Sequence, residues 1–315
     1  MRVRPWLLQV AALCWMLGLA LIVLRGFAPD AALGAGTDLW GTLWFFEWTA
    51  HALTAVEHPF HSSWGYWPVG EDLFTEAGGN QLDGVLAAPL VWLLGSPSWT
   101  WAWGLLLLLA NGASAHWLAR SLGASRVASL AAASLFVLHP YVQTELAMGR
   151  PTQALLFFTP LALGLLLRSR TDARWRWPAL AGVCFAAQAW TWWFMGHFSL
   201  LVLGPLVLAL AARERSWWPR LGLAAGAALL LVLPGVLPML LRASAGEVPG
   251  FEGDRSGFFD DLASLETMGW WVLAPSQGPV AVPVWLVGAL VAAAALVRER
   301  LAWGLALALG LLLAA

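Results

Sequence analysis

The stretch that decides the fold is WLLQVAALCWMLGLALIVL, residues 6–24. It has 19 consecutive residues without a charged side chain, and a helix needs about 20 mostly apolar residues to cross the hydrocarbon core of a bilayer. The apolar segment of a signal peptide is shorter, about 7–15 residues. Although AALGAG at residues 31–36 resembles a cleavage site, the length favours a retained first span.

The composition places the whole chain in a membrane. Of its 315 residues, 60% are hydrophobic and 11% are charged, whereas a soluble domain has roughly 25% charged residues. Such a chain cannot cover a surface exposed to water, which excludes soluble enzymes and nucleic-acid-binding proteins. The 23 tryptophans suit the two interfaces of a bilayer. We therefore expect an all-α, multi-pass bundle of transmembrane helices in the inner (cytoplasmic) membrane.

Apolar runs divide the chain into expected spans. After 6–24 they lie at about 99–118, 122–138, 153–167, 177–195, 197–212, 220–241, 283–297 and 301–315. A shorter run, 82–95, begins beside Asp83 and contains Pro89, and we interpret it as a helix at the membrane interface. This gives nine spans in a single bundle, residues 1–315. The chain ends at Ala315 within an apolar run, so it is possible that a longer protein continues beyond it.

The charged residues give the expected orientation. All 17 basic residues are arginines, and loops that stay in the cytoplasm carry the excess of arginine and lysine. With 82–95 at the interface, the arginines on the side of the amino terminus are Arg2, Arg4, Arg120, Arg126, Arg168, Arg170, Arg174, Arg176, Arg213, Arg215, Arg220, Arg298 and Arg300. Only Arg25, Arg150, Arg242 and Arg255 fall on the other side. We therefore expect a cytoplasmic amino terminus.

Two polar segments long enough to carry chemistry, 25–98 and 242–282, then face outward. No arginine or lysine occurs from Gly26 to Trp117, and the first segment contains Asp30, Asp38, Glu47, Glu57, Glu71, Asp72, Glu76 and Asp83. Such a surface suits general-base chemistry or a divalent cation, although acids are also simply tolerated on the outer side. The second segment holds Asp254, Asp260 and Asp261, and is either a mobile lid or a solvated connector.

Asp38 stands apart from the other acids. GTDLWGTLWFFEWTAHAL predicts a helix from about Asp38 to Val56, with Thr37 as N-cap. Helical spacing then places four side chains on one face, which are Trp40, Trp44, Glu47 and His51. This face suits a sugar ring beside a lipid boundary. The alternative is an interface helix whose first turn simply places Asp38 at the positive end of the helix dipole.

A second group lies in the short outer turn at 139–155. His139, Glu145, Arg150 and Gln153 are expected at the outer mouth between two spans. A guanidinium there can hold a phosphate with two hydrogen bonds, or it can reach to headgroups or pair with Glu145; the sequence leaves these alternatives open. The histidines of Glu57-His58-Pro59-Phe60-His61 lack enough converging ligands for a metal site, so we predict no metal ligands and no cofactor, a divalent cation excepted.

The order of these parts resembles the C-type glycosyltransferase superfamily, and within it the bacterial relatives of the protein mannosyltransferase and lipid A aminoarabinose transferase group. The matching residues lie within about 5–170 and are Gly36-Thr37-Asp38, Tyr66-Trp67-Pro68-Val69-Gly70, Ala88-Pro89-Leu90, Leu118-Ala119-Arg120-Ser121-Leu122-Gly123 and His139-Pro140. Leu39 follows Asp38 where many members carry a second acid, and Thr152-Gln153 stands where several have an aspartate.

The resemblance implies an integral membrane enzyme that takes a sugar from a polyprenyl-phosphate carrier. It implies that Asp38 is the catalytic base acting on the acceptor, that Arg150 faces the lipid phosphate, and that Trp40 or Trp44 stacks on the sugar. Two alternatives remain at this stage. One is a carrier or flippase of a lipid-linked or amphiphilic substrate, favoured by Pro205, Pro234 and Pro238 within apolar runs. The other is a membrane protein without catalytic activity, or a fragment.

Overall fold

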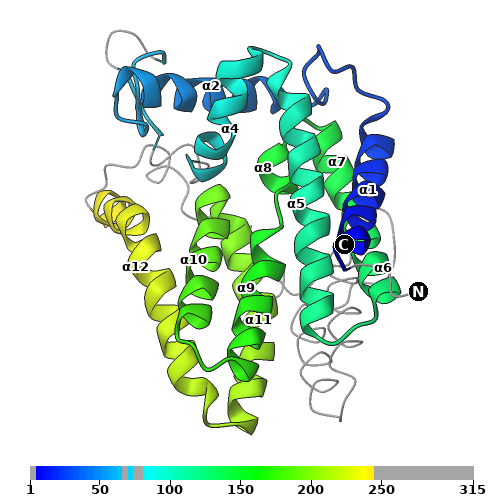
Figure 1. Ribbon diagram of the computed structural model, residues 1–315. Helices are drawn as coiled ribbons and strands as arrows, with labels where there is room; N and C mark the ends of the chain where they lie inside the picture. The colour runs from blue at the N-terminus through cyan, green and yellow to red at the C-terminus, as the bar shows by residue number, and fades with distance from the viewer. Residues whose placement is uncertain (1–4, 66–69, 74–80, 245–315) are drawn as a thin grey trace, which may run out of the picture.

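The computed structural model describes residues 5–65, 70–73 and 81–244. This part of the chain is helical apart from one pair of two-residue strands (Figure 1). The elements are α1 (Pro5–Leu24), α2 (Leu39–Ala55), β1 (His61–Ser62), β2 (Glu71–Asp72), α4 (Gln81–Leu94), α5 (Trp99–Ser121), α6 (Arg126–Val137), α7 (Pro140–Ala147), α8 (Pro151–Ala154), α9 (Phe158–Thr171), α10 (Arg176–Thr191), α11 (Trp193–Arg213) and α12 (Trp217–Ser244).

Five segments in the described part are long and apolar enough to cross a membrane. They are Trp6–Leu24, Trp99–Ser121, Arg126–Ala147, Pro151–Thr171 and Trp217–Pro238, and a sixth is added if the bent pair within α11 is counted as one span. The first seven expected apolar runs overlap helices, but 153–167 and 177–195 each cross a break between two helices. α10 has only 16 residues and is not among the candidate spans. The expected runs 283–297 and 301–315, and nearly all of the expected loop 242–282, lie outside the described residues.

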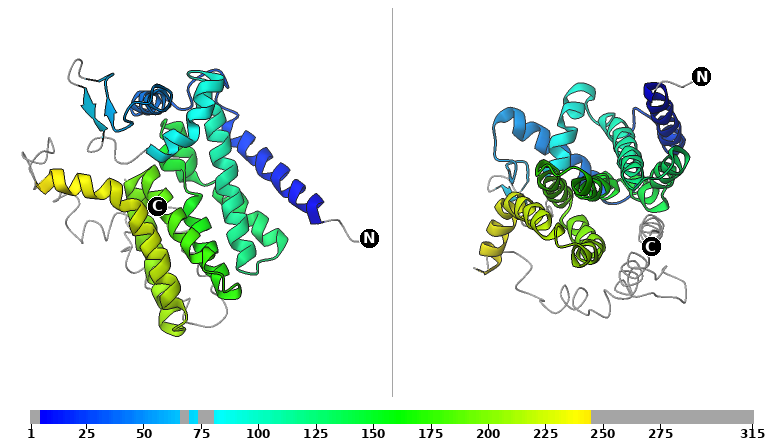
Figure 2. Two further views of the ribbon diagram at one scale, coloured as in Figure 1. Left: turned by 60° about the vertical axis from the view of Figure 1, so that its left-hand side comes forward. Right: turned by 60° about the horizontal axis from the view of Figure 1, so that its bottom comes forward.

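Two helices lie across one end of the bundle. α2 lies across the end of α5, and α4 lies beneath α2 in this view (Figure 1). The helices approach closely where Gly84 of α4 meets Thr49 of α2, because a Cβ on Gly84 would come within 2.9 Å of the Thr49 hydroxyl. The short β1–β2 pair follows α2 and is antiparallel, with His61 opposite Asp72 (Figure 2). The helices α2 and α4 of the segment 25–98 thus cover one end of the bundle (Figure 1).

The helix predicted from Asp38 to Val56 is confirmed within one residue at each end, but its expected cap is wrong. The N-cap residue is Asp38 and not Thr37, and the Asp38 side chain makes no capping hydrogen bond. That carboxylate is occupied elsewhere, as described below. The helix ends at Val56, which adopts a left-handed conformation with φ of 57°.

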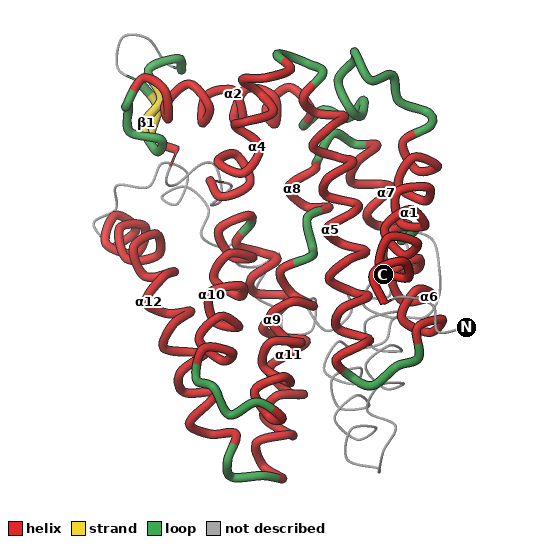
Figure 3. The backbone as a smooth tube through the Cα atoms, viewed as in Figure 1, coloured by secondary structure: helices red, strands yellow, loops and turns green. Residues whose placement is uncertain are grey.

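The loops at the opposite end of the bundle are rich in arginine. The turns between α5 and α6, α9 and α10, and α11 and α12 all lie at the end remote from α2 (Figures 1 and 3). Arginines in or beside these turns are Arg120, Arg126, Arg168, Arg170, Arg174, Arg176, Arg213, Arg215 and Arg220. Arg25 and Arg150 lie at the α2 end. The expected separation of the described arginines between the two ends is thus present in the fold.

The span predicted at 153–167 begins with a break, which side chains of neighbouring helices stabilise (Figure 3). Between α8 and α9 the chain leaves the helical path at Leu155, so backbone groups lose their helical partners. Asn111 of α5 is fully buried, donates to the Ala154 carbonyl at 2.9 Å and accepts from the Leu156 amide at 3.0 Å. Gln188 of α10 donates to the Leu155 carbonyl at 2.8 Å. These two amides fix the position of α8.

Replacing Asn111 with Leu removes both hydrogen bonds while keeping a side chain of similar size. The Leu156 amide and the Ala154 carbonyl then stay buried without partners, which costs about 1–3 kcal/mol for each group. We expect a lower thermal unfolding temperature of the purified protein in detergent. Ser114→Ala is the matched control, since Ser114 lies one turn further on α5 and bonds only to the carbonyl of Asn111 within the same helix. Equal effects of the two substitutions would contradict this explanation.

Candidate functional site

Three charged side chains from distant parts of the sequence meet at the α2 end of the bundle. The Arg150 Nε donates to Asp38 Oδ2 at 2.6 Å, across 112 positions of sequence. The Arg150 Nη1 also lies 3.6 Å from Glu145 Oε2, which makes an ion pair rather than a hydrogen bond. Arg150 therefore lies between two carboxylates. If it moves away from one of them, the other still neutralises part of its positive charge.

Exposure differs sharply among the three residues. The Asp38 side chain is 55% exposed and the Arg150 side chain 32%, whereas the Glu145 side chain is only 11% exposed. Asp38 is therefore accessible from outside the protein, while Glu145 supports Arg150 from within. The sequence alone left open whether Arg150 pairs with Glu145 or holds a phosphate. In the structure it pairs with both Glu145 and Asp38. The pair with Asp38 is exposed, so an anion can compete with Asp38 for the guanidinium, whereas Glu145 is buried behind it.

Glycines bring the segment before α2 against the segment after α7. The Ala35 amide donates to the Ala147 carbonyl at 2.8 Å. A Cβ on Gly34 would lie 2.4 Å from the Gly149 amide nitrogen, and a Cβ on Gly36 would lie 2.2 Å from the Met148 carbonyl oxygen. Gly149 itself has φ of 75°, and a Cβ there would meet Leu39. Only residues without a side chain allow this approach, and it places Asp38 beside Arg150.

Gly34→Ala tests this contact. Gly34 has φ of 102° and no room for a Cβ, so the two backbones must separate or the loop must change conformation, at a cost of about 2 kcal/mol or more. We expect a clear fall in unfolding temperature. Gly41→Ala is the control, because Gly41 lies within α2 and an added Cβ would meet nothing within 4 Å, and alanine there favours the helix by about 1 kcal/mol. The contact would be unimportant if both variants unfolded at the same temperature as the wild type.

Asp83 is the residue of this region that sequence reasoning missed. The sequence places it among eight acids of an outward-facing segment, but its side chain is fully buried in α4. Thr152 of α8 donates a hydrogen bond to its Oδ2, and the Gly84 amide donates to its Oδ1 at 3.0 Å. The pair ties α4 to α8 two residues after Arg150. The available signal was an acid inside an otherwise apolar run, which is costly unless the acid is hydrogen-bonded or neutral.

Burial raises the pKa of the Asp83 carboxyl to about 8, although the hydrogen bonds from Thr152 and Gly84 oppose that rise. The folded protein therefore holds a proton on Asp83 that the unfolded chain, with an ordinary pKa of 3.8, has released. The contribution of Asp83 to stability is present in full at low pH. It is lost as the pH rises from about 4 to about 8, and over this range the free energy of unfolding falls by at most about 1.4 kcal/mol per pH unit.

We expect Asp83→Asn to flatten this dependence, because the amide keeps the shape and cannot ionise. At pH 8 the variant should unfold at a temperature equal to or above that of the wild type, and the difference should shrink towards pH 5. The measurement is thermal unfolding of both proteins across that pH range. Asp30→Asn, at an exposed position in the segment after α1, should leave the wild-type slope in place. An unchanged slope in Asp83→Asn would show that Asp83 is not responsible.

The predicted aromatic and polar face of α2 does not converge on Asp38. Trp40 is 73% exposed, whereas Trp44 is half-buried and packs against the hydrophobic core. Glu47 accepts a long hydrogen bond of 3.5 Å from the Trp99 indole. His51 lies 3.5 Å from Glu57 and stacks near Trp64 with ring centroids 4.8 Å apart. The four residues share the less buried side of the helix, but Glu47 and His51 have local partners of their own.

Of the group predicted at the outer mouth, the side chains of Glu145 and Arg150 come together, and Gln153 contacts Arg150 through the backbone, its amide donating to the Arg150 carbonyl at 3.1 Å. His139 is buried and caps α7, where its Nδ1 accepts from the Tyr141 amide at 3.1 Å. Gln153 lies half-buried in α8. Within residues 5–65, 70–73 and 81–244 no three His, Cys, Asp or Glu side chains are grouped so as to hold a metal ion. The His58 Nδ1 accepts from the Phe60 amide at 3.3 Å.

Comparison with known proteins adds no family to this description. No protein-family model matches the chain, and no curated protein sequence matches it.

Proposed function

We propose that this protein is a membrane glycosyltransferase that moves a sugar from a polyprenyl-phosphate donor to an acceptor on the outer face. The observation that supports the proposal best is the Asp38–Arg150 pair, in which an accessible carboxylate and a guanidinium meet at 2.6 Å at one end of an apolar bundle. A polyprenyl donor has its chain in the bilayer and its phosphate at the surface. A site at the helix ends is where such a phosphate and a water-borne acceptor can meet.

The chemistry follows from the charges. The acceptor oxygen attacks the anomeric carbon, the bond between that carbon and the phosphate oxygen breaks, and the polyprenyl phosphate leaves with the electron pair. The Asp38 carboxylate takes the proton of the acceptor hydroxyl. Arg150 stabilises the negative charge on the departing phosphate. Trp40, exposed in the first turn of α2, offers a ring on which the sugar can stack.

The resting contact between Arg150 and Asp38 must open for this reaction. While the Arg150 Nε occupies Asp38 Oδ2, that oxygen is a poor proton acceptor. A donor phosphate draws the guanidinium away by a charge-assisted, two-pronged contact, and Glu145 keeps part of the arginine compensated during the exchange. Asp38 is thereby activated only when the donor is bound, which limits transfer in its absence.

The proposed placement in the membrane has nine spans, a cytoplasmic amino terminus, and α2 and α4 as interfacial helices on the outer face. It is supported by the separation of arginines between the two ends of the described bundle, with the arginine-rich turns on the cytoplasmic side. Five of these spans, or six with the bent pair in α11, correspond to candidate membrane helices. The span at 177–195 and the last two are assigned from the sequence alone.

The first test is mass spectrometry of lipids that co-purify with the protein. We expect polyprenyl phosphate or its sugar adduct with the wild type, reduced at least about tenfold in Arg150→Ala because a two-pronged contact to phosphate is lost. Asp38→Asn should retain the lipid and abolish transfer to added acceptors, since it affects the proton acceptor and not the phosphate. The two variants therefore separate binding from catalysis.

The matched controls are Arg120→Ala, an exposed arginine at the opposite end, and Asp30→Asn, an exposed aspartate in the same segment as Asp38. Both should behave as the wild type. Unchanged turnover in Asp38→Asn would refute the proposed mechanism. Bulk phospholipid alone in every sample would refute the donor site and favour a protein without catalytic activity, whereas movement of an unmodified lipid-linked substrate across a vesicle membrane would favour a carrier.

A further inference from the structure

A cavity of about 340 Å³ lies at the end of the bundle opposite Asp38, between the α9–α10 turn and the α11–α12 turn. Its lining includes Arg174, Trp175, Pro178, Ser216, Pro219 and Arg220. Two guanidinium groups from different turns therefore face one space, with apolar rings beside them. Neither the Asp38 site nor the proposed transfer reaction uses these residues.

The surroundings of the cavity carry a strong excess of positive charge. Residues 168–176 and 213–220 contain seven arginines against two acids, Asp172 and Glu214. Both acids already have partners: Arg170 Nε lies 3.3 Å from Glu214, and Arg174 Nε lies 3.6 Å from Asp172. The Ser216 hydroxyl also donates to Glu214 at 2.6 Å. Two acids cannot neutralise seven arginines, so this part of the protein keeps a net positive charge.

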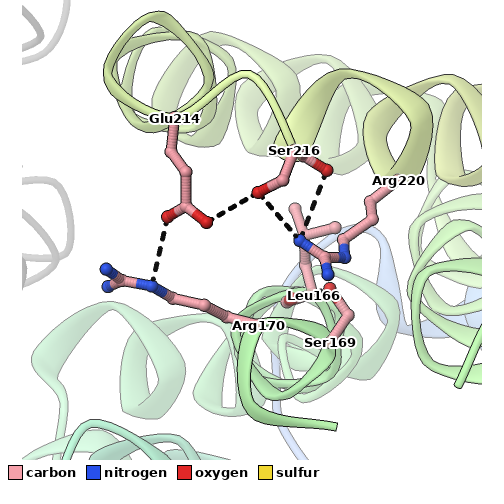
Figure 4. Close-up of polar contacts among 6 residues, drawn as sticks. All are labelled: Leu166, Ser169, Arg170, Glu214, Ser216 and Arg220. Carbon is pink, nitrogen blue, oxygen red and sulfur yellow. Dashed lines mark hydrogen bonds and ion pairs between the residues drawn. The ribbon is translucent and has the colours of Figure 1, made fainter. Parts of the chain in front are cut away.

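Arg220 is held in position by Ser216, and its charge also acts on the nearby Glu214 carboxylate. Its Nη1 donates to the Ser216 carbonyl and hydroxyl oxygens, both at 3.3 Å (Figure 4). These contacts use one of the three guanidinium nitrogens, and among the described residues Arg220 makes no ion pair. A guanidinium fixed in this way matches the geometry of a phosphate group, which accepts two parallel hydrogen bonds.

The helix that begins at the cavity has an apolar surface along its length. α12 is the least buried of the five candidate spans, and Leu229 and Leu230 are 63% and 71% exposed. Trp175 and Trp218, at the start of α10 and α12, are each more than half exposed, as is usual for indole rings at the level of lipid headgroups. The cavity thus lies where the headgroup of a lipid packed along α12 would lie.

We propose that this cavity binds the phosphate of an anionic phospholipid whose acyl chains lie along the exposed face of α12. Arg220 and Arg174 hold the phosphate, Trp175 and the two prolines border the headgroup, and the remaining arginines of the two turns attract anionic lipid in preference to neutral lipid. A soluble anion would use only the contacts with Arg220 and Arg174, because it has no apolar part to place on α12. This inference does not depend on the proposed transfer activity.

The test is native mass spectrometry of the full chain in detergent with phosphatidylglycerol and with phosphatidylcholine of the same acyl chains. We expect the wild type to retain phosphatidylglycerol preferentially. Arg174→Gln/Arg220→Gln should bind it at least about tenfold more weakly, because two charge-assisted contacts are lost. Arg120→Gln/Arg126→Gln removes the same charge from another turn at the same end and should keep the preference. Should the cavity double variant fail to fold, Arg174→Gln alone serves, since that side chain is 66% exposed.

Three results would overturn the proposal. Equal retention of the two lipids by the wild type would show that the cavity does not select an anionic headgroup. Equal losses in the cavity variant and the Arg120/Arg126 variant would show that the preference comes from overall charge and not from this cavity. Displacement of phosphatidylglycerol by inorganic phosphate at comparable concentration would identify a site for soluble anions. A preserved preference in Arg174→Lys/Arg220→Lys, against its loss in the glutamine variant, would support contact through charge.

Discussion

The close contact between residues 34–36 and 147–149 is the constraint on which the arrangement of the α2 end depends. Two backbones approach there to a distance that leaves no space for a Cβ at Gly34, Gly36 or Gly149. The contact fixes where the chain arrives after α1, and therefore where α2 begins and in which direction it crosses the helix ends. It also brings Asp38 to Arg150. The charged pair is a result of this backbone packing, because an exposed ion pair by itself contributes only about 0–1 kcal/mol.

Polar side chains inside the bundle serve mainly to hold irregular backbone in place. Asn111 and Gln188 supply the hydrogen bonds that the break between α8 and α9 removes, and Asp83 ties α4 to α8 through Thr152. In an apolar environment such groups are costly without a partner, and Asn111, Gln188 and Asp83 each have one. The result is that the short segment carrying Arg150 and Thr152 is held from α2, α4, α5 and α10 at once, which suits a site that must keep its geometry at a membrane surface.

The two ends of the bundle have opposite chemical character. Acids and the proposed transfer site lie at the α2 end, and arginines with the proposed lipid site lie at the other. In the proposed orientation both follow from the same electrostatic rule, because cationic turns stay on the cytoplasmic side and face the anionic lipids there. A lipid held along α12 at that side would stabilise the helices that pack on α10, which in turn holds Leu155 behind the Arg150 segment.

The sequence by itself determined the helical, apolar class of protein, the approximate positions of its long apolar helices and the separation of charge, since these depend on local composition and period. It also singled out Asp38, Glu145 and Arg150 by their residue type and place. It did not show the separate short helices α7 and α8 or the breaks before α9 and α11. It could not show that Asp38, and not Thr37, is the N-cap of α2, or that Asp83 is fully buried. Nor could it show that Glu47 and His51, on the face with Trp40 and Trp44, contact neighbouring side chains other than Asp38. Those features depend on contacts that form only in the folded chain, such as the hydrogen bond from Thr152 to Asp83. The meeting of Asp38 with Arg150 depends likewise on glycines at positions 34, 36 and 149, whose role becomes visible only when the segments they join are seen together.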